Sequence, residues 1–244
     1  MLVFILFSAL LLMTLIFFIL LSKEEKEKIE LFHVIVHRFR SPVSIAKWYV
    51  ELLSDKSVGP LNDKQKEYFT EIYNASEKLN ETIDSLIVLL QLKSNHLNVK
   101  IEKVNVKDLI AQIISKLNFK IQRHKIHVEE VYPKEREASI QTDSKLLAIA
   151  LQNLIENAVR YTSENGNVDI KISFTNKKML IEIKDSGYGI PREGRSKILA
   201  NSVNSKDMGF SLYLVKLIIK KIQATIRFES EENKGTTFFI SLPA

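Results

Sequence analysis

Apolar residues repeat with a heptad spacing in two consecutive parts of the chain. The first stripe comprises Phe32, Val36, Phe39, Val43, Ala46, Val50 and Leu53. The second stripe comprises Tyr68, Ile72, Ala75, Leu79, Thr82, Leu86 and Leu89. Alternating steps of about four and three residues are typical of helices that pack along a seam. Gly59 and Pro60 interrupt the helix between the two stripes, so the pattern predicts a helical hairpin over residues 23–94.

A hairpin of two helices is too thin to bury both stripes. Two hairpins related by a twofold axis form a four-helix bundle, in which each stripe finds neighbours on more than one side. We therefore expect the chain to be a homodimer, with residues 23–94 as the dimerisation region.

From about Asn95 the heptad spacing gives way to a mixture of strand and helix patterns. Apolar residues alternate with polar ones at 168–174, 179–183 and 238–242, as in half-buried strands. Helical stretches are predicted at 106–123, 144–161 and 209–222. These elements predict an antiparallel or mixed sheet with helices on one face, so the fold class is α+β and residues 95–244 form a second domain.

The N-terminal segment Leu2–Leu21 carries no charged side chain. About 20 apolar residues in a helix cross a ~30 Å hydrocarbon layer. A cleaved signal peptide is the alternative, but a basic N-terminal region and a small-residue cleavage pattern are both missing. Lys23, Lys26 and Lys28 follow the segment directly, which favours a cytoplasmic location for the remainder of the chain. Residues 1–22 are thus predicted to be a single transmembrane anchor.

Composition limits the partners that the chain can have. Of the 244 residues, 45% are hydrophobic and 26% are charged, which is enough for two modest packed domains. The net charge of +6 is spread along the chain and suits a surface near anionic lipid. No segment interleaves basic and aromatic residues, so no nucleic-acid partner is expected. The lack of cysteine fits a cytoplasmic compartment.

Four short motifs occur in a fixed order. They read HVIVHRFRSPV at 33–43, NLIENAVRYT at 153–162, DSGYGIP at 185–191 and GTTFFISLP at 235–243. Together they resemble the sensor histidine kinases of two-component systems. The resemblance implies a phosphoacceptor hairpin of the HisKA type and an α/β sandwich of the GHKL (Bergerat) type that binds ATP and Mg²⁺. It also implies a response regulator receiver domain as partner and, with the anchor, a single-pass protein of a bacterial-type inner membrane.

The first motif resembles the phosphoacceptor box of this family. The resemblance makes His37 the acceptor of the γ-phosphoryl group, with Arg40, Ser41 and Pro42 at matching positions. Ser41 aligns with a residue that helps to dephosphorylate the partner. The acidic residue that usually follows the histidine is Arg38 here. An arginine cannot act as the general base that a carboxylate provides in the family.

The second motif resembles the family's asparagine box on the predicted helix 144–161. The resemblance implies that Asn157 offers its amide oxygen to Mg²⁺, which prefers oxygen ligands. Asn153 supports the same region, Arg160 offers positive charge to phosphate, and Tyr161 packs beside the nucleotide. Asp143 matches an acidic residue that commonly precedes this helix in the family.

The third and fourth motifs resemble the remaining parts of the nucleotide site. By this resemblance Asp185 accepts a hydrogen bond from the exocyclic amino group of adenine. Gly187 and Gly189 permit a close approach or a positive φ. Thr236 lies near the rim of the site, and Gly209 belongs to the lid over the phosphates.

The lid departs from the family pattern. Of three expected glycines only Gly209 is present, because Asp207 and Ser211 occupy the other two positions. A carboxylate is unfavourable where phosphates bind. We therefore expect a membrane-anchored histidine kinase with weakened ATP binding, or alternatively a degenerate kinase that serves as a phosphatase or scaffold for a response regulator. An ATPase related to gyrase and Hsp90 is disfavoured, because the position of their catalytic glutamate is Asn153 here.

Overall fold

The computed structural model describes residues 25–54, 59, 61–93, 97–134, 136–175, 178–193, 195 and 209–243. The chain divides into two compact units, residues 1–97 and residues 98–244. Within the described ranges, no helix combines the length and the apolar character needed to cross a membrane. The predicted span Leu2–Leu21 lies outside the described residues.

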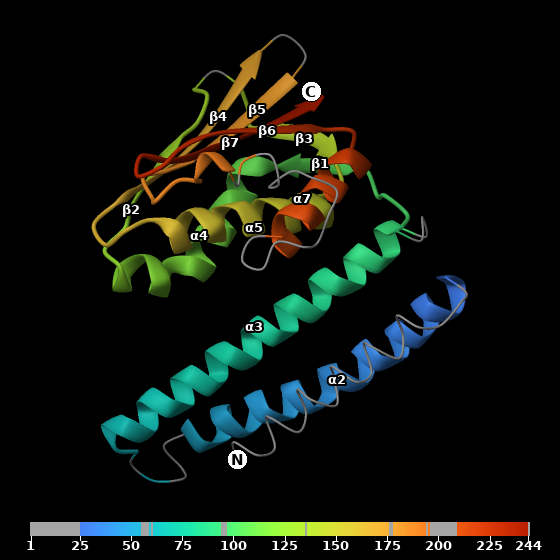
Figure 1. Ribbon diagram of the computed structural model, residues 1–244, viewed down its shortest axis with the longest axis vertical. Helices are drawn as coiled ribbons and strands as arrows, with labels where there is room; N and C mark the ends of the chain where they lie inside the picture. The colour runs from blue at the N-terminus through green and yellow to red at the C-terminus, as the bar shows by residue number, and fades with distance from the viewer. Residues whose placement is uncertain are drawn as a thin grey trace. The chain divides into compact units, whose positions relative to one another are not determined.

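The first unit contains the predicted hairpin, formed by α2 (Glu25–Ser54) and α3 (Asp63–Lys93) (Figure 1). α3 begins at a reciprocal cap, in which Asn62 and Gln65 each accept the backbone N–H of the other at 2.9 Å. Ion pairs between Arg40 and Asp84, and between Lys47 and Glu77 at 2.7 Å, join the helices. The helical hairpin is therefore confirmed.

The predicted seam is only partly buried within one chain. Val36, Val43 and Val50 of α2 are buried against α3. Several other seam positions are exposed, namely Ala46, Leu53, Tyr68, Ala75, Leu79 and Thr82. The reason is geometric, because each helix of an isolated hairpin has one neighbour and can bury only one side of its apolar stripe.

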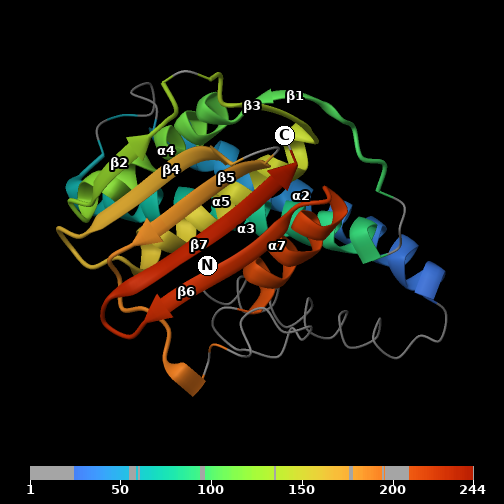
Figure 2. The same ribbon diagram turned by 90° about the horizontal axis from the view of Figure 1, so that it is seen from above.

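The second unit is built on a five-stranded sheet with the order β2-β4-β5-β7-β6 (Figure 2). β2 and β4 run parallel, and the other neighbours are antiparallel. A separate antiparallel pair joins β1 to β3. The bounds are β1 Glu102–Asn105, β2 His127–Val131, β3 Ser139–Thr142, β4 Asn167–Thr175, β5 Lys178–Asp185, β6 Thr225–Glu231 and β7 Gly235–Pro243.

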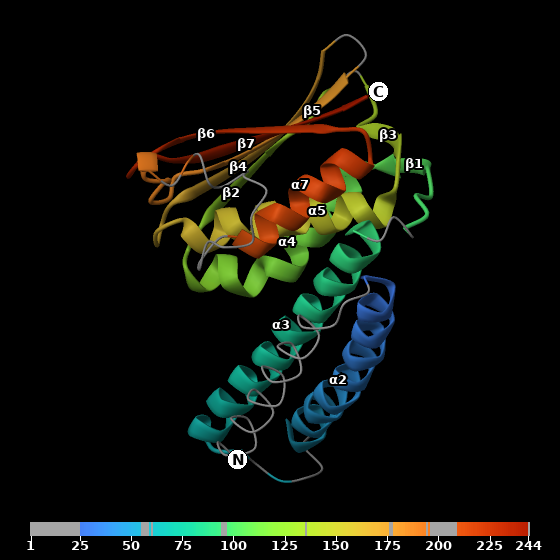
Figure 3. The same ribbon diagram turned by 45° about the vertical axis from the view of Figure 1, so that its right-hand side comes forward.

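Helices of the described part of the second unit cover one face of this sheet (Figure 3). α5 (Ser144–Tyr161) packs against both α4 (Val106–Arg123) and α7 (Gly209–Lys221) and also contacts β5. The core between the layers contains fully buried side chains from α5 and from the central strands, namely Leu147, Leu151, Leu154, Ile170, Ile181 and Ile183. The predicted α+β class, with helices on one face of a mixed sheet, is confirmed, and α5 lies at the centre of the helical layer.

Candidate functional site

The last turns of α5 carry the polar residues of the second motif. Asn153, Asn157 and Arg160 are spaced by four and three residues, so they share one side of the helix. The Asn153 side chain is half-buried and donates its amide N–H to the carbonyl of Ile149 at 2.8 Å. Asn157 is also half-buried, and no described residue hydrogen-bonds its side chain. Its amide oxygen is therefore open to a ligand.

Glu156 occupies the neighbouring side of α5 and is only 7% exposed. Its Oε1 accepts hydrogen bonds from Lys120 Nζ of α4 at 3.0 Å and from an Arg160 guanidinium nitrogen at 3.5 Å. A carboxylate that is buried and paired with two cations is poorly placed to activate water. This pairing agrees with the expectation that α5 lacks a hydrolytic base. The contact to Lys120 joins residues 36 positions apart, so no local sequence pattern indicates it.

Asp185 ends β5 and is 6% exposed. Its Oδ1 accepts the backbone N–H of Gly187 at 2.9 Å and that of Thr236 at 3.1 Å. Burial raises the pKa of Asp185 above its ordinary value, and the two backbone hydrogen bonds offset only part of this shift. Among the described residues only Oδ1 has partners, so Oδ2 remains an acceptor for a ligand that donates an N–H.

Two glycines hold the turn after β5 close to its neighbours. A Cβ at Gly187 would lie 2.2 Å from the carbonyl oxygen of Tyr161, the last residue of α5. The backbone N–H of Tyr188 donates to that same oxygen at 3.3 Å. Gly189 has a φ of +63°, and a Cβ there would lie 2.0 Å from the carbonyl oxygen of Glu231. Both predicted properties, close approach and positive φ, occur in this turn.

Ser230 of β6 completes the junction and was not predicted. Its Oγ accepts the N–H of Ile190 at 2.8 Å and lies 3.1 Å from the carbonyl oxygen of Gly235 and 2.9 Å from Thr236 Oγ1. The end of α5, the turn after β5 and the start of β7 thus meet around Asp185. Only Tyr161, Asp185, Gly187, Gly189 and Thr236 of the predicted residues are joined directly by these contacts.

Binding of a metal ion at this site would require further oxygen ligands from a bound phosphate compound. Within the described ranges, no group of three or more His, Cys, Asp or Glu side chains could hold a metal. The amide oxygen of Asn157 is a suitable donor for Mg²⁺, which commonly takes one protein ligand together with phosphate oxygens and water. The donor present therefore fits the predicted ion only when a phosphate ligand supplies further oxygens.

The other predicted residues take no part in the site contacts described above. Gly209 is the first residue of α7, and Ser211 is half-buried in its first turn, whereas Asp207 lies outside the described residues. In the first unit the backbone at His37 is helical, and its side chain is not among those described. Ser41 is exposed.

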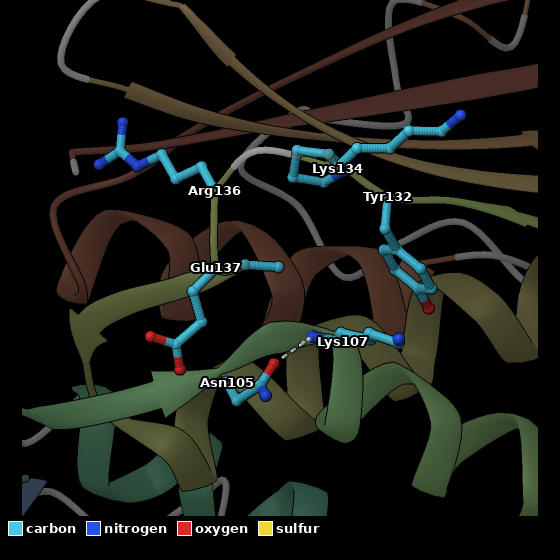
Figure 4. Close-up of a pocket in the computed structure, with 8 residues that line it drawn as sticks. Asn105, Lys107, Tyr132, Lys134, Arg136 and Glu137 are labelled. Atoms are coloured by element: carbon cyan, nitrogen blue, oxygen red, sulfur yellow. Dashed lines mark hydrogen bonds between the residues drawn. The ribbon is translucent and has the colours of Figure 1, made fainter.

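A hollow of about 340 Å³ lies elsewhere on the second unit, between the start of α4 and the β2–β3 connection (Figure 4). None of the predicted site residues lines it. Arg136 and Lys134 point in opposite directions (Figure 4). Glu137 is paired with Lys103 at 2.7 Å. Arg136 stacks on the ring of Phe174 at 3.9 Å. The charged side chains of this hollow therefore do not converge on a common ligand.

Two family models match the chain. The model of the "Histidine kinase-, DNA gyrase B-, and HSP90-like ATPase" family matches residues 142–244. The model of the "His Kinase A (phospho-acceptor) domain" matches residues 27–95. The first contains the α5 motif, the turn after β5 and the start of β7, and the second contains the helical hairpin.

Curated relatives and solved structures agree with these matches. Sensor protein RprX of Bacteroides fragilis is 27% identical over 97% of this chain and 48% of its own length. Sporulation kinase A of Bacillus subtilis is 28% identical over 92% of this chain and 36% of its own length. The catalytic domain of histidine kinase ThkA is 26% identical with a TM-score of 0.53, over 59% of this chain and 97% of that domain.

Full-length ShkA in complex with AMPPNP shares the fold, with a TM-score of 0.69 at 20% identity over 88% of this chain and 45% of that structure. The chain spans about half or less of the length of the two curated relatives, RprX and sporulation kinase A. The predicted family is confirmed by the two matches taken together.

Proposed function

Because the chain belongs to the sensor histidine kinases and carries their phosphoacceptor and ATPase-type domains, we propose that it phosphorylates His37 from ATP. The phosphoryl group then passes to an aspartate on the receiver domain of a response regulator. We further propose that residues 1–22 anchor the protein in a bacterial-type inner membrane, with both domains in the cytoplasm. The junction around Asp185 is the observation that carries the proposal.

The nucleotide occupies the second unit at that junction. Asp185 Oδ2 accepts a hydrogen bond from the exocyclic amino group of adenine, because Oδ1 already accepts hydrogen bonds from two backbone N–H groups. The asparagines of α5 lie toward the phosphates, and Arg160 contributes positive charge there. The amide oxygen of Asn157 would hold Mg²⁺, which would supply positive charge to the phosphate oxygens.

His37 attacks the γ-phosphorus with the unprotonated nitrogen of a neutral imidazole. The new P–N bond forms as the bond to the bridging oxygen of ADP breaks, and ADP leaves. The proton on the other ring nitrogen must then be released, and Arg38 cannot accept it because a guanidinium stays protonated. Release to water replaces the general base, so we expect autophosphorylation to be slow compared with family members that have a carboxylate at this position.

The exposed half of the heptad seam supports a homodimer. Ala46 and Leu53 of α2 and Tyr68 and Leu79 of α3 are exposed in a single hairpin, although their spacing is that of a packed seam. Apolar side chains in such a stripe are stabilised when a second copy covers them. A twofold pairing buries the same residues on both hairpins.

A second apolar face of α2 supports docking of a receiver domain. Ile45, Trp48, Tyr49 and Leu52 are exposed, and Trp48 is 56% exposed. Positions 37, 41, 45 and 48 follow one another at steps of four, four and three residues. Residues with this spacing share one side of a helix, so the acceptor position lies on the same side as Ile45 and Trp48. Exposed aromatic side chains are typical anchors of protein interfaces. Ser41 on the same side serves the opposing hydrolysis, in which water attacks the phosphoryl group on the partner's aspartate and inorganic phosphate leaves.

A labelling experiment tests the proposal. The full chain is incubated with radiolabelled ATP and Mg²⁺, and the expected result is acid-labile label that is lost in His37→Gln. Absence of label in a protein that still dimerises would favour the degenerate alternative, which Arg38 and Ser211 support. Membrane anchoring is tested separately, by comparing the membrane fraction of cells that produce the full chain or a chain lacking residues 1–22.

A further inference from the structure

One buried carboxylate joins two segments of the second unit that are distant in sequence. Asp143 precedes α5 and is 6% exposed. Its Oδ1 accepts the backbone N–H of Leu146 at 3.0 Å, which is the usual N-cap bond. Its Oδ2 accepts the backbone N–H of Lys100 at 2.8 Å. Lys100 belongs to the segment that leads from α3 into the second unit.

Neighbouring side chains reinforce this connection. Ser144 Oγ donates to Glu102, and Lys100 Nζ lies 3.2 Å from the Glu102 carboxylate. These contacts lower the pKa of Glu102, with the Ser144 hydroxyl as the largest cause and Lys100 next. We call Lys100, Glu102, Asp143 and Ser144 the linker clamp. It holds the linker against the first turn of α5.

Capping alone does not account for an aspartate at this position. Asn and Ser cap helices about as well as Asp, because one side-chain oxygen is sufficient. A carboxylate differs in having two acceptor oxygens and no donor. The second oxygen is the feature that an asparagine or a serine would lose, and in this structure it binds the linker.

We propose that Asp143 is a positioning residue for phosphoryl transfer, because it fastens the linker to the helix that carries the nucleotide residues. This inference rests on the proposed function. The linker runs from α3, in the unit that contains His37, to β1, in the unit that binds ATP, and Lys100 lies in its part that belongs to the second unit. α5 begins at the clamp and ends beside Asp185, so a rigid helix about 27 Å long connects the linker to the nucleotide.

The clamp also limits the free length of the linker. From Lys93, the end of α3, to Lys100 the chain can extend at most about 25 Å. Without the Asp143 bond the next fixed residue is Glu102 in β1, and the limit rises to about 32 Å. A longer and less directed linker brings His37 and the γ-phosphate together less often, whereas binding of ATP to the second unit does not require the linker.

The test compares Asp143→Asn and Asp143→Ser in the full chain with Asp108→Asn as a matched control. Asp108 lies in the exposed first turn of α4, outside the clamp and the nucleotide site. Both Asp143 variants keep a capping oxygen. We expect the Lys100 amide to exchange hydrogen about tenfold faster in both, which is the size of one hydrogen bond to a charged group. At saturating ATP, labelling of His37 should slow about tenfold.

The affinity for ATP should stay within about twofold of the wild type in both Asp143 variants, since the predicted effect is on transfer. An equal loss of affinity and transfer rate would overturn the inference, because it would mean that the nucleotide site itself had been damaged. Unchanged exchange at Lys100 would overturn it as well. If the wild type carries no label on His37, the proposed function fails, and the clamp is then judged by the Lys100 exchange alone.

Discussion

Replacement of Gly187 by alanine tests whether the turn after β5 must touch the end of α5. The added Cβ would lie 2.2 Å from the carbonyl oxygen of Tyr161 and 2.9 Å from Asp185 Oδ1. The first of these atoms belongs to the backbone, so the turn or the helix end has to move. Overpacking of this kind costs about 1–3 kcal/mol, and the lower entropy of the unfolded alanine chain offsets about 0.4–1 kcal/mol.

We therefore expect Gly187→Ala to lower the stability of the second unit by roughly 1–2 kcal/mol, a fall in Tm of about 3–6 °C. ATP affinity should fall about tenfold, because a displaced turn moves Asp185. Far-UV circular dichroism and hydrogen exchange of α5 measure the stability. Trp48 fluorescence would be unsuitable, since the single tryptophan lies in the first unit.

Gly166→Ala is the matched control. Its added Cβ would meet the side-chain ends of Thr162 and Ser186, at 2.5 and 2.8 Å, and a backbone oxygen only at 3.0 Å. Thr162 bonds the Ala158 carbonyl and Ser186 bonds the Asn167 N–H, so rotation of these side chains has a cost of roughly 1 kcal/mol. We expect little change in ATP affinity, because neither side chain holds Asp185. A Gly187→Ala protein as stable and as avid for ATP as the Gly166→Ala protein would refute the reasoning.

Three further substitutions, the last with a control variant, test other contacts. Asp185→Asn replaces one acceptor oxygen of the carboxylate by an N–H donor. Competition titration should therefore show about tenfold weaker binding of ATP and a smaller loss of affinity for GTP. Equal losses for the two nucleotides would contradict this. The pKa of Asp185 is raised in the folded protein, so the wild type should lose stability relative to Asp185→Asn as the pH rises through that raised pKa. Urea titrations of both proteins from about pH 3 to 7 measure this difference. Glu156→Gln should cost about 1–2 kcal/mol in thermal melts, below the cost for a fully buried pair because both cationic partners are half exposed. Trp48→Ala should change stability by about 0.5 kcal/mol or less but slow transfer to the receiver domain, whereas Val43→Ala, at a buried position, should cost roughly 2 kcal/mol.

The elements predicted best from the sequence are those with an unambiguous periodicity. α4 and α5 have a strong apolar stripe and a side-chain cap at the start, and both occur with the predicted bounds. β4 and β5 alternate clearly because one face of each strand is buried, whereas β7 is buried on both faces at Phe238–Ile240 and alternates only toward its end. The hairpin is predicted as well, and the exposed part of its two stripes agrees with the expectation that a single hairpin cannot bury both.

The missed elements carry weak patterns for a physical reason. β2 and β6 are the edges of the sheet, and their exposed positions hold charged residues that interrupt the hydrophobic signal. β1 and β3 have four residues each, too few for a periodicity to be visible. Their pairing with each other, rather than with the main sheet, depends on contacts that local sequence does not encode.

The residues of the candidate site also fall into a group that the sequence predicts and a group that it does not. The shared face of Asn153 and Asn157 follows from helical spacing alone, so sequence was sufficient to predict it. The contacts of Glu156 with Lys120 and of Ser230 with Ile190 join elements that are about 40 residues apart, and no local pattern marks them. The sequence therefore predicts well which residues share one element. It predicts poorly which residues of other elements hold them in place.

α5 combines these separate observations in one element. Its first turn is fixed to the linker through Asp143, Glu156 ties it to α4, and its last residue supports the turn that contains Asp185. Its apolar side is fully buried at Leu147, Leu151 and Leu154, and close-packed interiors resist local deformation. A displacement of the linker is therefore expected to shift α5 as a rigid body, so that the two ends of the helix respond together.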